Sequence, residues 1–233
     1  EPEVVAEAGI MKNTANTHVV RHAGRILALM EGAPPTEITP DLDTVGEYDF
    51  DGALVGPMTA HPKIDPVTGE MVLFGYNPFP PYLRVHVADP AGRLVRSVEV
   101  DLPAPVMMHD FAVSSRHVVL FDLPALFDLP AMLQGGPGIR WEPGNGSRIG
   151  VMDRADLGAP VRWFETEPFW MFHVLNAYDD GDAVVVEGCR TDRLNTAFGG
   201  DEPARARPPV LHRWRIDLAA GTVTDEQVDD RPG

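Results

Sequence analysis

The sequence is poor in cysteine and in long hydrophobic runs. Cys189 is its single cysteine, so no disulfide can form within the chain. Such usage favours a reducing compartment and predicts a cytoplasmic location, with the thiol itself buried at the end of a strand. No segment reaches the roughly 18 apolar residues of a transmembrane helix, and no signal-peptide pattern is visible. The sequence therefore gives no sign of secretion or of a membrane-spanning segment.

Basic residues are also scarce. There are 19 Lys and Arg residues against 35 Asp and Glu residues, which leaves a formal net charge of −16 at pH 7. Nucleic-acid binding needs cationic side chains to neutralise phosphates, and a polybasic contact with anionic lipid needs the same kind of face. The charge balance therefore argues against both roles.

Proline and glycine, in contrast, are abundant. The 23 Pro and 22 Gly residues divide the chain into short segments, so long helices are not expected. Hydrophobic residues make up 44% and charged residues 23%, as in a globular domain. Apolar runs and alternating segments between turns predict strands. These predicted strands lie within residues 18–31, 71–76, 83–88, 94–102, 106–113, 117–123, 147–153, 161–165, 183–189 and 211–218.

The rest of the chain has little regular pattern. One short helix is predicted around residues 124–133, a surface loop at residues 195–209, and an acidic tail from residue 222. Many short strands favour an all-β sandwich, barrel or propeller. Groups of strands recur every 40 to 60 residues or so without a strict repeat, a spacing compatible with propeller blades.

Three of the eight histidines stand in apolar surroundings at predicted strand ends: His61, His109 and His173. A buried imidazole is costly unless it is hydrogen-bonded or bound to a metal. The intervals of 48 and 64 residues are each about one blade, so the three could meet at a propeller axis. Imidazole ligands suit Fe, Zn, Cu or Ni. The alternative is that each is a hydrogen-bonded core histidine.

The other five histidines carry a weaker signal. His18 and His22 are four residues apart, but that spacing has no ligand meaning on strands. His86, His117 and His212 stand in alternating segments and are predicted to face solvent.

The segments around His61, His109 and His173 resemble the carotenoid cleavage oxygenases, non-haem iron enzymes that split carbon–carbon double bonds with O₂. The resemblance covers nearly the whole chain, in order. Its motifs are Asn16-Thr17, LALME at 27–31, TAHPKIDPVTGE at 59–70, PVMMHDF at 105–111, RIGV at 148–151, WFE at 163–165 and FHVLNAY at 172–178.

The resemblance implies a seven-bladed β-propeller about twice this length, of which residues 1–233 form one incomplete domain. We therefore expect the chain to be an internal fragment, consistent with its start at Glu1. The family holds Fe(2+) with four histidines, and His61, His109 and His173 match three of them; the fourth is expected outside this chain. Glu31 matches a glutamate that bonds to a ligand's other ring nitrogen. Alternatively, Glu31 ends a strand in solvent.

Four further positions bear on the substrate. Thr17 matches a threonine beside the open coordination position, and Met107 and Phe172 match residues that line the substrate tunnel. A strand threonine and two core side chains are the alternatives. The stilbene-cleaving branch has a lysine before the glutamate, where this chain has Met30. Since an apolar side chain cannot stabilise a phenolate, carotenoids or apocarotenoids are favoured.

The sequence thus predicts an Fe(II)-dependent dioxygenase that acts on a hydrophobic polyene and O₂ and gives two carbonyl products, with no catalytic residue beyond the metal centre. Alternatives are a lignostilbene-type enzyme, the isomerase branch of the family, and a propeller used only for binding. The 233 residues alone are expected to be inactive. Residues 79–82 and 123–133 are candidates for peripheral membrane contact, and packing of loops is the alternative for both segments.

Overall fold

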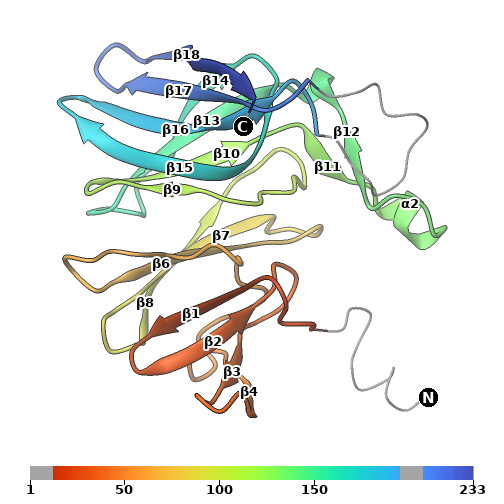
Figure 1. Ribbon diagram of the computed structural model, residues 1–233, viewed down its shortest axis with the longest axis vertical. Coiled ribbons are helices and arrows are strands. Elements are labelled where there is room, and N and C mark those ends of the chain that lie inside the picture. The colour runs from red at the N-terminus through yellow and green to blue at the C-terminus, as the bar shows by residue number, and fades with distance from the viewer. Residues whose placement is uncertain (1–12, 195–206, 233) are drawn as a thin grey trace. The chain divides into compact units, whose positions relative to one another are not determined.

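The computed structural model describes residues 13–194 and 207–232, and most of them lie in short antiparallel strands (Figure 1). The chain divides into two compact units, residues 1–101 and 102–233. Each unit contains two four-stranded sheets. The predicted all-β class is therefore confirmed. Most of the predicted loop at 195–209 falls outside the described residues.

The first unit consists of two meanders, in which each strand is hydrogen-bonded to the next along the chain. The first sheet contains β1 (His18–His22), β2 (Arg25–Leu29), β3 (Thr36–Ile38) and β4 (Thr44–Glu47). The second contains β5 (Lys63–Ile64), β6 (Met71–Tyr76), β7 (Leu83–Ala88) and β8 (Leu94–Val100). Four-stranded sheets of this kind are the unit of β-propellers.

Burial in the second sheet follows the sequence pattern. The alternating strand β8 has one half-buried face and one exposed face, whereas the apolar strand β6 is buried along nearly its whole length. Gly75 in β6 cannot carry a side chain, because a Cβ there would lie 2.1 Å from the carbonyl oxygen of Pro57. Side chains from both sheets, including Leu27, Leu29 and Leu73, share one core.

The second unit adds an insertion to the same plan. Its first sheet has the order β14-β13-β10-β9, and its second is the meander β15-β16-β17-β18. The hairpin of β11 and β12, with the short helix α2 between its strands, is inserted between β10 and β13 (Figure 1). The bounds are β9 (Ala112–Val113), β10 (His117–Asp122), β11 (Ala125–Phe127), α2 (Leu129–Leu133), β12 (Ile139–Trp141), β13 (Ser147–Asp153), β14 (Arg162–Thr166), β15 (Trp170–Asp180), β16 (Ala183–Thr191), β17 (Val210–Asp217) and β18 (Thr222–Pro232).

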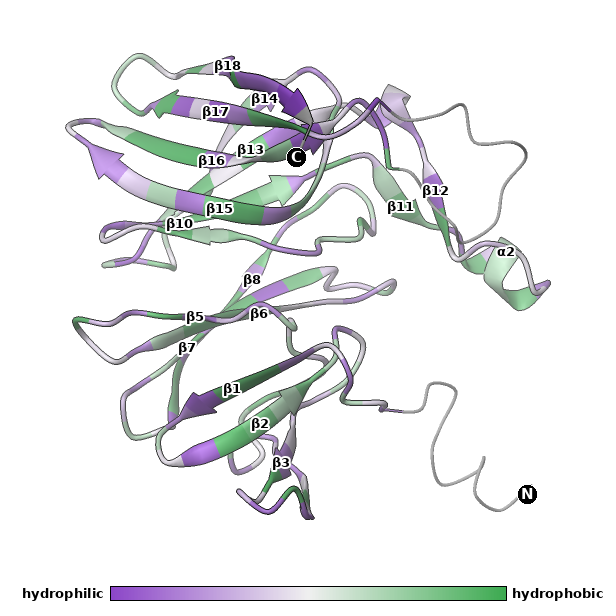
Figure 2. Ribbon diagram, in the orientation of Figure 1, coloured by the Kyte–Doolittle hydropathy of each residue, from purple (hydrophilic) through white to green (hydrophobic). Residues whose placement is uncertain are grey.

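One hydrophobic cluster contains side chains from both four-stranded sheets of this unit. Phe169 stacks on Trp214 with 4.9 Å between ring centroids, and both side chains are fully buried. Val184 and Val186 extend this core along β16, which Figure 2 colours as hydrophobic.

Three predictions about local structure need correction. Of the predicted strand at residues 106–113, only Ala112–Val113 is paired in a sheet. The residues before it form an isolated β-bridge, from Val106 to Leu126. The helix predicted at 124–133 is restricted to Leu129–Leu133, since β11 takes up its first part. The acidic tail is the 11-residue strand β18, hydrophilic in Figure 2. Pairing with β17, rather than apolar alternation, makes it a strand.

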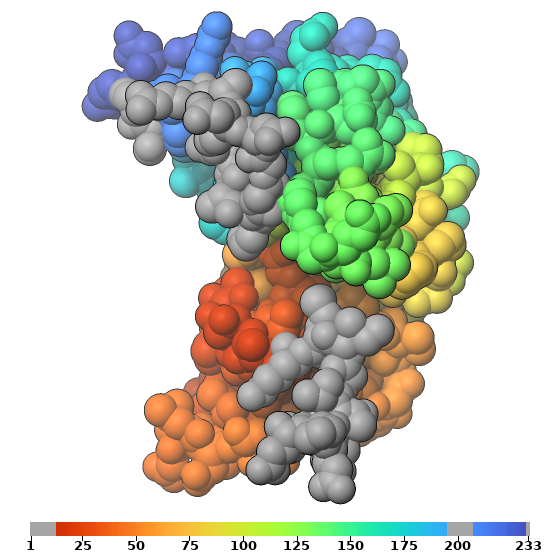
Figure 3. Space-filling model, turned by 90° about the vertical axis from the view of Figure 1, so that its right-hand side faces the viewer, coloured from red at the N-terminus to blue at the C-terminus, as the bar shows by residue number. Residues whose placement is uncertain are grey.

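Exposed apolar side chains occur at both segments expected to contact membranes. Phe79 is 60% exposed, and Leu133 in α2 is 90% exposed. The space-filling view in Figure 3 shows the green segment that contains α2 at the surface. Within the described residues, no helix has the length and hydrophobicity needed to cross a membrane. Peripheral membrane contact stays a prediction.

His86 gives the first unit a testable pH dependence. Burial, and secondarily the charge of Arg84, lowers the pKa of its imidazole to about 4, from an ordinary 6.5. A histidine with a lowered pKa stabilises the fold above the unfolded-state pKa, and this contribution disappears as the pH falls from 6.5 to 4. The difference corresponds to about 3 kcal/mol.

We expect His86→Gln, which does not titrate, to flatten the loss of unfolding free energy between pH 6.5 and 4. Urea unfolding at several pH values measures this slope for the parent and the variant. Parallel losses in the two proteins would assign the acid sensitivity to other groups.

Candidate metal centre

The three predicted ligands occupy corresponding places in successive sheets. His61 comes two residues before β5, His109 three residues before β9, and His173 lies within β15. Each of these strands is both the first and an edge strand of its sheet. Thr17 directly precedes β1, the corresponding strand of the first sheet. Three of the four-stranded sheets thus carry a predicted ligand just before or within their first strand.

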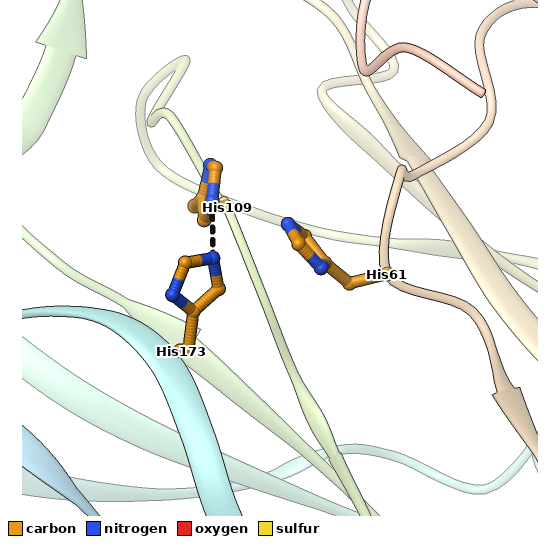
Figure 4. Close-up of side chains that lie close together, drawn as sticks. All are labelled: His61, His109 and His173. Atoms are coloured by element: carbon orange, nitrogen blue, oxygen red, sulfur yellow. Dashed lines mark hydrogen bonds between the residues drawn. The ribbon is translucent and has the colours of Figure 1, made fainter. Parts of the chain in front are cut away.

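Within the second unit, His109 and His173 meet directly. Their Nε2 atoms are 3.2 Å apart and their ring centroids 5.0 Å apart (Figure 4). Two imidazole nitrogens bound at right angles to one ion, each about 2.1 Å away, would stand about 3 Å apart. The spacing therefore fits a shared divalent metal as well as a hydrogen bond. Imidazole donors suit iron, zinc, copper and nickel.

A β-bulge in β15 directs the His173 side chain toward His109. Met171 is paired with Arg190 and Val174 with Gly188, so Phe172 and His173 both lie opposite Cys189. The extra residue interrupts the strand's alternation, as bulges do. Both Phe172 and His173 are consequently exposed, whereas Trp170 and Met171 are buried.

Gly188 makes room for the bulge. A Cβ at this position would lie 2.2 Å from Met171 Sδ and 3.1 Å from the backbone oxygen of His173. Its φ angle is not in the left-handed region, so the requirement for glycine here is steric. Gly188, which pairs with Val174, thus allows the path that the backbone of β15 takes at Met171 and His173.

A buried aspartate connects the two histidine segments. Asp110 is 6% exposed, and its Oδ1 accepts the N–H of Phe111 at 2.8 Å. Its Oδ2 accepts the N–H of Val174, the residue after His173, at 2.9 Å. Sequence reasoning missed Asp110, although a carboxylate in the apolar run VMMHDFAV was a usable signal.

An apolar hollow of about 700 Å³ lies beside His173. Its lining includes Trp170, Phe172, Leu175, Cys189 and Pro209. Phe172, expected to line a substrate tunnel, does line this hollow, and its ring meets that of His109 edge-on at 5.2 Å. Cys189 is exposed, so its predicted burial is wrong. The bulge places its backbone opposite Phe172 and His173, away from the core.

Met107, the other expected tunnel residue, is partly buried against the hydrophobic core of the second unit. Its backbone N–H donates to the carbonyl of Ala125 at 2.7 Å. Within the described structure Met107 thus has a packing role, and its tunnel role stays a prediction.

In the first unit, His61 lies against a half-buried carboxylate. Glu31 Oε1 is 3.8 Å from His61 Nε2, and the Glu31 side chain is 16% exposed. The hydroxyl of Tyr76 donates to Glu31 Oε2 at 2.6 Å. Burial, together with the negative charge of Glu31, raises the pKa of Tyr76 well above its ordinary value, so Tyr76 stays a neutral donor.

The backbone around His61 is also held in place. The N–H of His61 donates to Thr59 Oγ1 at 3.0 Å, and the carbonyl of Ala60 lies 2.8 Å from His18 Nδ1. His18 therefore contacts the loop that carries a predicted ligand, a role that its spacing from His22 did not indicate.

Thr17 and Met30 lie near the start of the first sheet. The N–H of Thr17 donates to the carbonyl of Leu29 at 2.9 Å, and its side chain is exposed. The sulfur of Met30 accepts the N–H of Thr14 at 3.2 Å. Neither contact assigns a function to these residues.

The prediction that His86, His117 and His212 face solvent is wrong. His86 is 2% exposed, with its Nδ1 2.8 Å from Ser97 Oγ. His117 and His212 pair with Asp179 and Asp225, each at 2.6 Å. Asp179 lies in β15 and Asp225 in β18, so carboxylates on other strands, which strand alternation does not reveal, hold His117 and His212 against the sheets.

The bulge predicts the effect of a substitution at Gly188. We expect Gly188→Ala to lower the free energy of unfolding by about 1–3 kcal/mol, because the buried Met171 side chain and the backbone of His173 would have to move. Chemical denaturation measures this loss. Gly158→Ala is a matched control, since a Cβ there meets only Asp156 Oδ1, at 3.4 Å. Equal stability of the two variants would contradict the steric argument.

Comparison with known proteins places this site in context. The family model described as retinal pigment epithelial membrane protein matches residues 3–233. The chain is 36% identical to a carotenoid cleavage oxygenase of Mycobacterium tuberculosis, covering 96% of this chain and 53% of that protein. It is 35% identical to an isoeugenol monooxygenase of Pseudomonas putida, covering 91% of this chain and 46% of that protein.

A solved structure has a closely similar fold over this chain. The solved lignostilbene dioxygenase of Pseudomonas brassicacearum superposes with a TM-score of 0.86 at 33% identity, covering 96% of this chain and 49% of that one. The chain thus spans about half the length of the curated relatives and the solved structure that it matches.

Proposed function

This chain belongs to the family of the retinal pigment epithelial membrane protein and the carotenoid cleavage oxygenases, and on that premise we propose that the complete protein is an Fe(II)-dependent dioxygenase. Its reaction would cleave a carbon–carbon double bond of a carotenoid or apocarotenoid and give two carbonyl products. The observation that carries the proposal is the 3.2 Å approach of His109 Nε2 to His173 Nε2.

We propose His61 as a third ligand of the same ion. It stands before the first strand of its sheet, as His109 does in the next one. Glu31, next to His61 Nε2 and held by Tyr76, would balance charge and restrict the ring's orientation. A bound Fe(II) ion would supply the binding and activation of O₂.

His212 is not proposed as a fourth ligand. It follows His173 in the sequence, but its Nδ1 pairs with Asp225 at 2.6 Å and its ring stacks on Trp214. No protein side chain is proposed as a general acid or base. The chain's own part would be to hold the ligands and to orient the substrate.

The hollow beside His173 supports an apolar substrate. Phe172, Leu175 and Trp170 provide hydrophobic surface there, and burial of a polyene against it would be favourable by roughly 25 cal/mol per Å². Phe172 also contacts His109, so a substrate held by its ring would lie close to the proposed ion. Thr17 is proposed to limit access at the open coordination position.

A stilbene or a related phenylpropanoid is the second candidate substrate class, because two of the relatives compared above are named for such compounds. Met30 disfavours it, since a thioether held by Thr14 offers no positive charge to a phenolate. A metal-free binding role is the remaining alternative. Bound iron in the purified complete protein would contradict this alternative, and its absence would favour it.

The metal proposal predicts the iron content of single variants. We expect the complete protein to hold about one iron per chain, and the alanine variants of His61, His109 and His173 each to lose at least about 90% of it, because each removes one ligand. Elemental analysis of purified protein measures the content.

His212→Ala is the matched control: it removes a histidine of the second unit that is bonded to Asp225, and it should keep its iron. Iron-free parent protein, or equal iron in all four variants, would favour the binding role instead.

The substrate proposal predicts a difference between two assays. The complete protein should cleave an apocarotenoid faster than a hydroxystilbene, whereas the 233 residues alone should cleave neither. Met30→Lys should raise the rate on the hydroxystilbene about tenfold, because an ammonium group can stabilise the phenolate. Met30→Leu is the uncharged control. Faster turnover of the hydroxystilbene by the parent protein would transfer the proposal to the stilbene class.

A further inference from the structure

We propose that Asp110 is a positioning residue that sets the distance between His109 and His173. This inference rests on the proposed metal centre. Asp110 follows His109 directly in the sequence, and its Oδ2 accepts the N–H of Val174, which directly follows His173. One carboxylate therefore links the backbones of the two ligand segments across 64 residues of chain.

The place where Asp110 bonds is the weak point of β15. This strand is at the edge of its sheet, and among residues 13–194 and 207–232 no further strand pairs with it on the side away from β16. The ladder to β16 is interrupted between Met171 and Val174 and again between Val174 and Asn176. Val174 lies between the two irregularities. A bond from its N–H to a fixed acceptor would restrict the strand where pairing with β16 cannot.

The acceptor itself is fixed. Asp110 is 6% exposed, and its Oδ1 accepts the N–H of Phe111, whose side chain is fully buried. A buried carboxylate that accepts backbone N–H groups makes short, strong bonds and cannot rotate freely. Asp110 is not proposed as a ligand, because the two oxygens are directed to these backbone groups. It would act on the metal only through His109 and His173.

Asp179 shows what a purely structural counterpart looks like. It also lies in β15, six residues after His173, and its side chain is 9% exposed. It accepts bonds from Ser114 Oγ, Ser115 Oγ and the N–H of Arg116, and pairs with His117. Both aspartates thus fasten β15 to the chain around β9 and β10, but of the two only Asp110 adjoins the proposed ligands His109 and His173.

The experiment compares Asp110→Asn with Asp179→Asn in the complete protein, using Co(II) as the probe. An asparagine side chain has one acceptor oxygen, so Asp110→Asn cannot accept both backbone bonds. We expect a 10- to 100-fold loss of Co(II) affinity and a changed visible absorption spectrum, the effect typical of residues that orient metal ligands. Asp179→Asn should lower the melting temperature and leave affinity and spectrum at parent values.

A second variant covers the case in which Asp110→Asn does not fold. Asp110→Glu keeps the charge and both acceptor oxygens but moves them by one methylene. It should bind Co(II) with an altered spectrum, because the bond to Val174 then requires a shift of His109 or β15. Circular dichroism establishes that each variant compared is folded.

The outcomes separate this inference from the proposed function. If the parent binds no Co(II), both fail. If the parent binds Co(II) and the folded Asp110 variants match it in affinity and spectrum, the positioning role is wrong while the metal centre stands. If Asp179→Asn changes the spectrum as much as Asp110→Asn does, general anchoring of β15 explains the effect and the specific role of Asp110 is overturned.

Discussion

The bulge in β15 is the constraint on which the rest of the site in the second unit depends. Strict alternation would send Phe172 and His173 to opposite faces of the sheet, and one of them would enter the core beside Trp170. Two residues opposite Cys189 instead expose both side chains. The aromatic ring that lines the hollow and the imidazole that meets His109 therefore lie next to each other because of one local irregularity.

How much of this could be predicted depended on the kind of interaction involved. The strands at 71–76, 83–88 and 147–153 were predicted with their observed bounds, because apolar side chains and turn residues mark them locally. The three histidines were singled out by their apolar surroundings at predicted strand ends, and Glu31 was added by resemblance. β18 was missed, because its strand conformation comes from pairing with β17 rather than from its own apolar residues. The bulge was also missed, because it exists only in the register with β16.

The acidic residues also have a structural role. The net charge alone argued only against nucleic-acid binding and a polybasic contact with anionic lipid. In the fold, several carboxylates act as acceptors that join segments distant in sequence: Asp110 reaches Val174, Asp179 reaches the loop before β10, and Asp122 receives Arg148 at 2.7 Å. Such bonds are invisible to composition and to strand periodicity. They explain why His117 and His212 are held against the sheets instead of facing solvent.

These carboxylates also bear on the proposed metal centre. Imidazole ligands are neutral, so the protein must compensate the charge of a divalent ion from outside the ligand set. Glu31 lies against His61, and Asp110 directly follows His109, so each unit supplies one carboxylate close to a proposed ligand. Each is in turn held by a neutral donor, Tyr76 or a backbone N–H. Positions fixed in this way would keep the open coordination sites free of carboxylate oxygen and available to O₂.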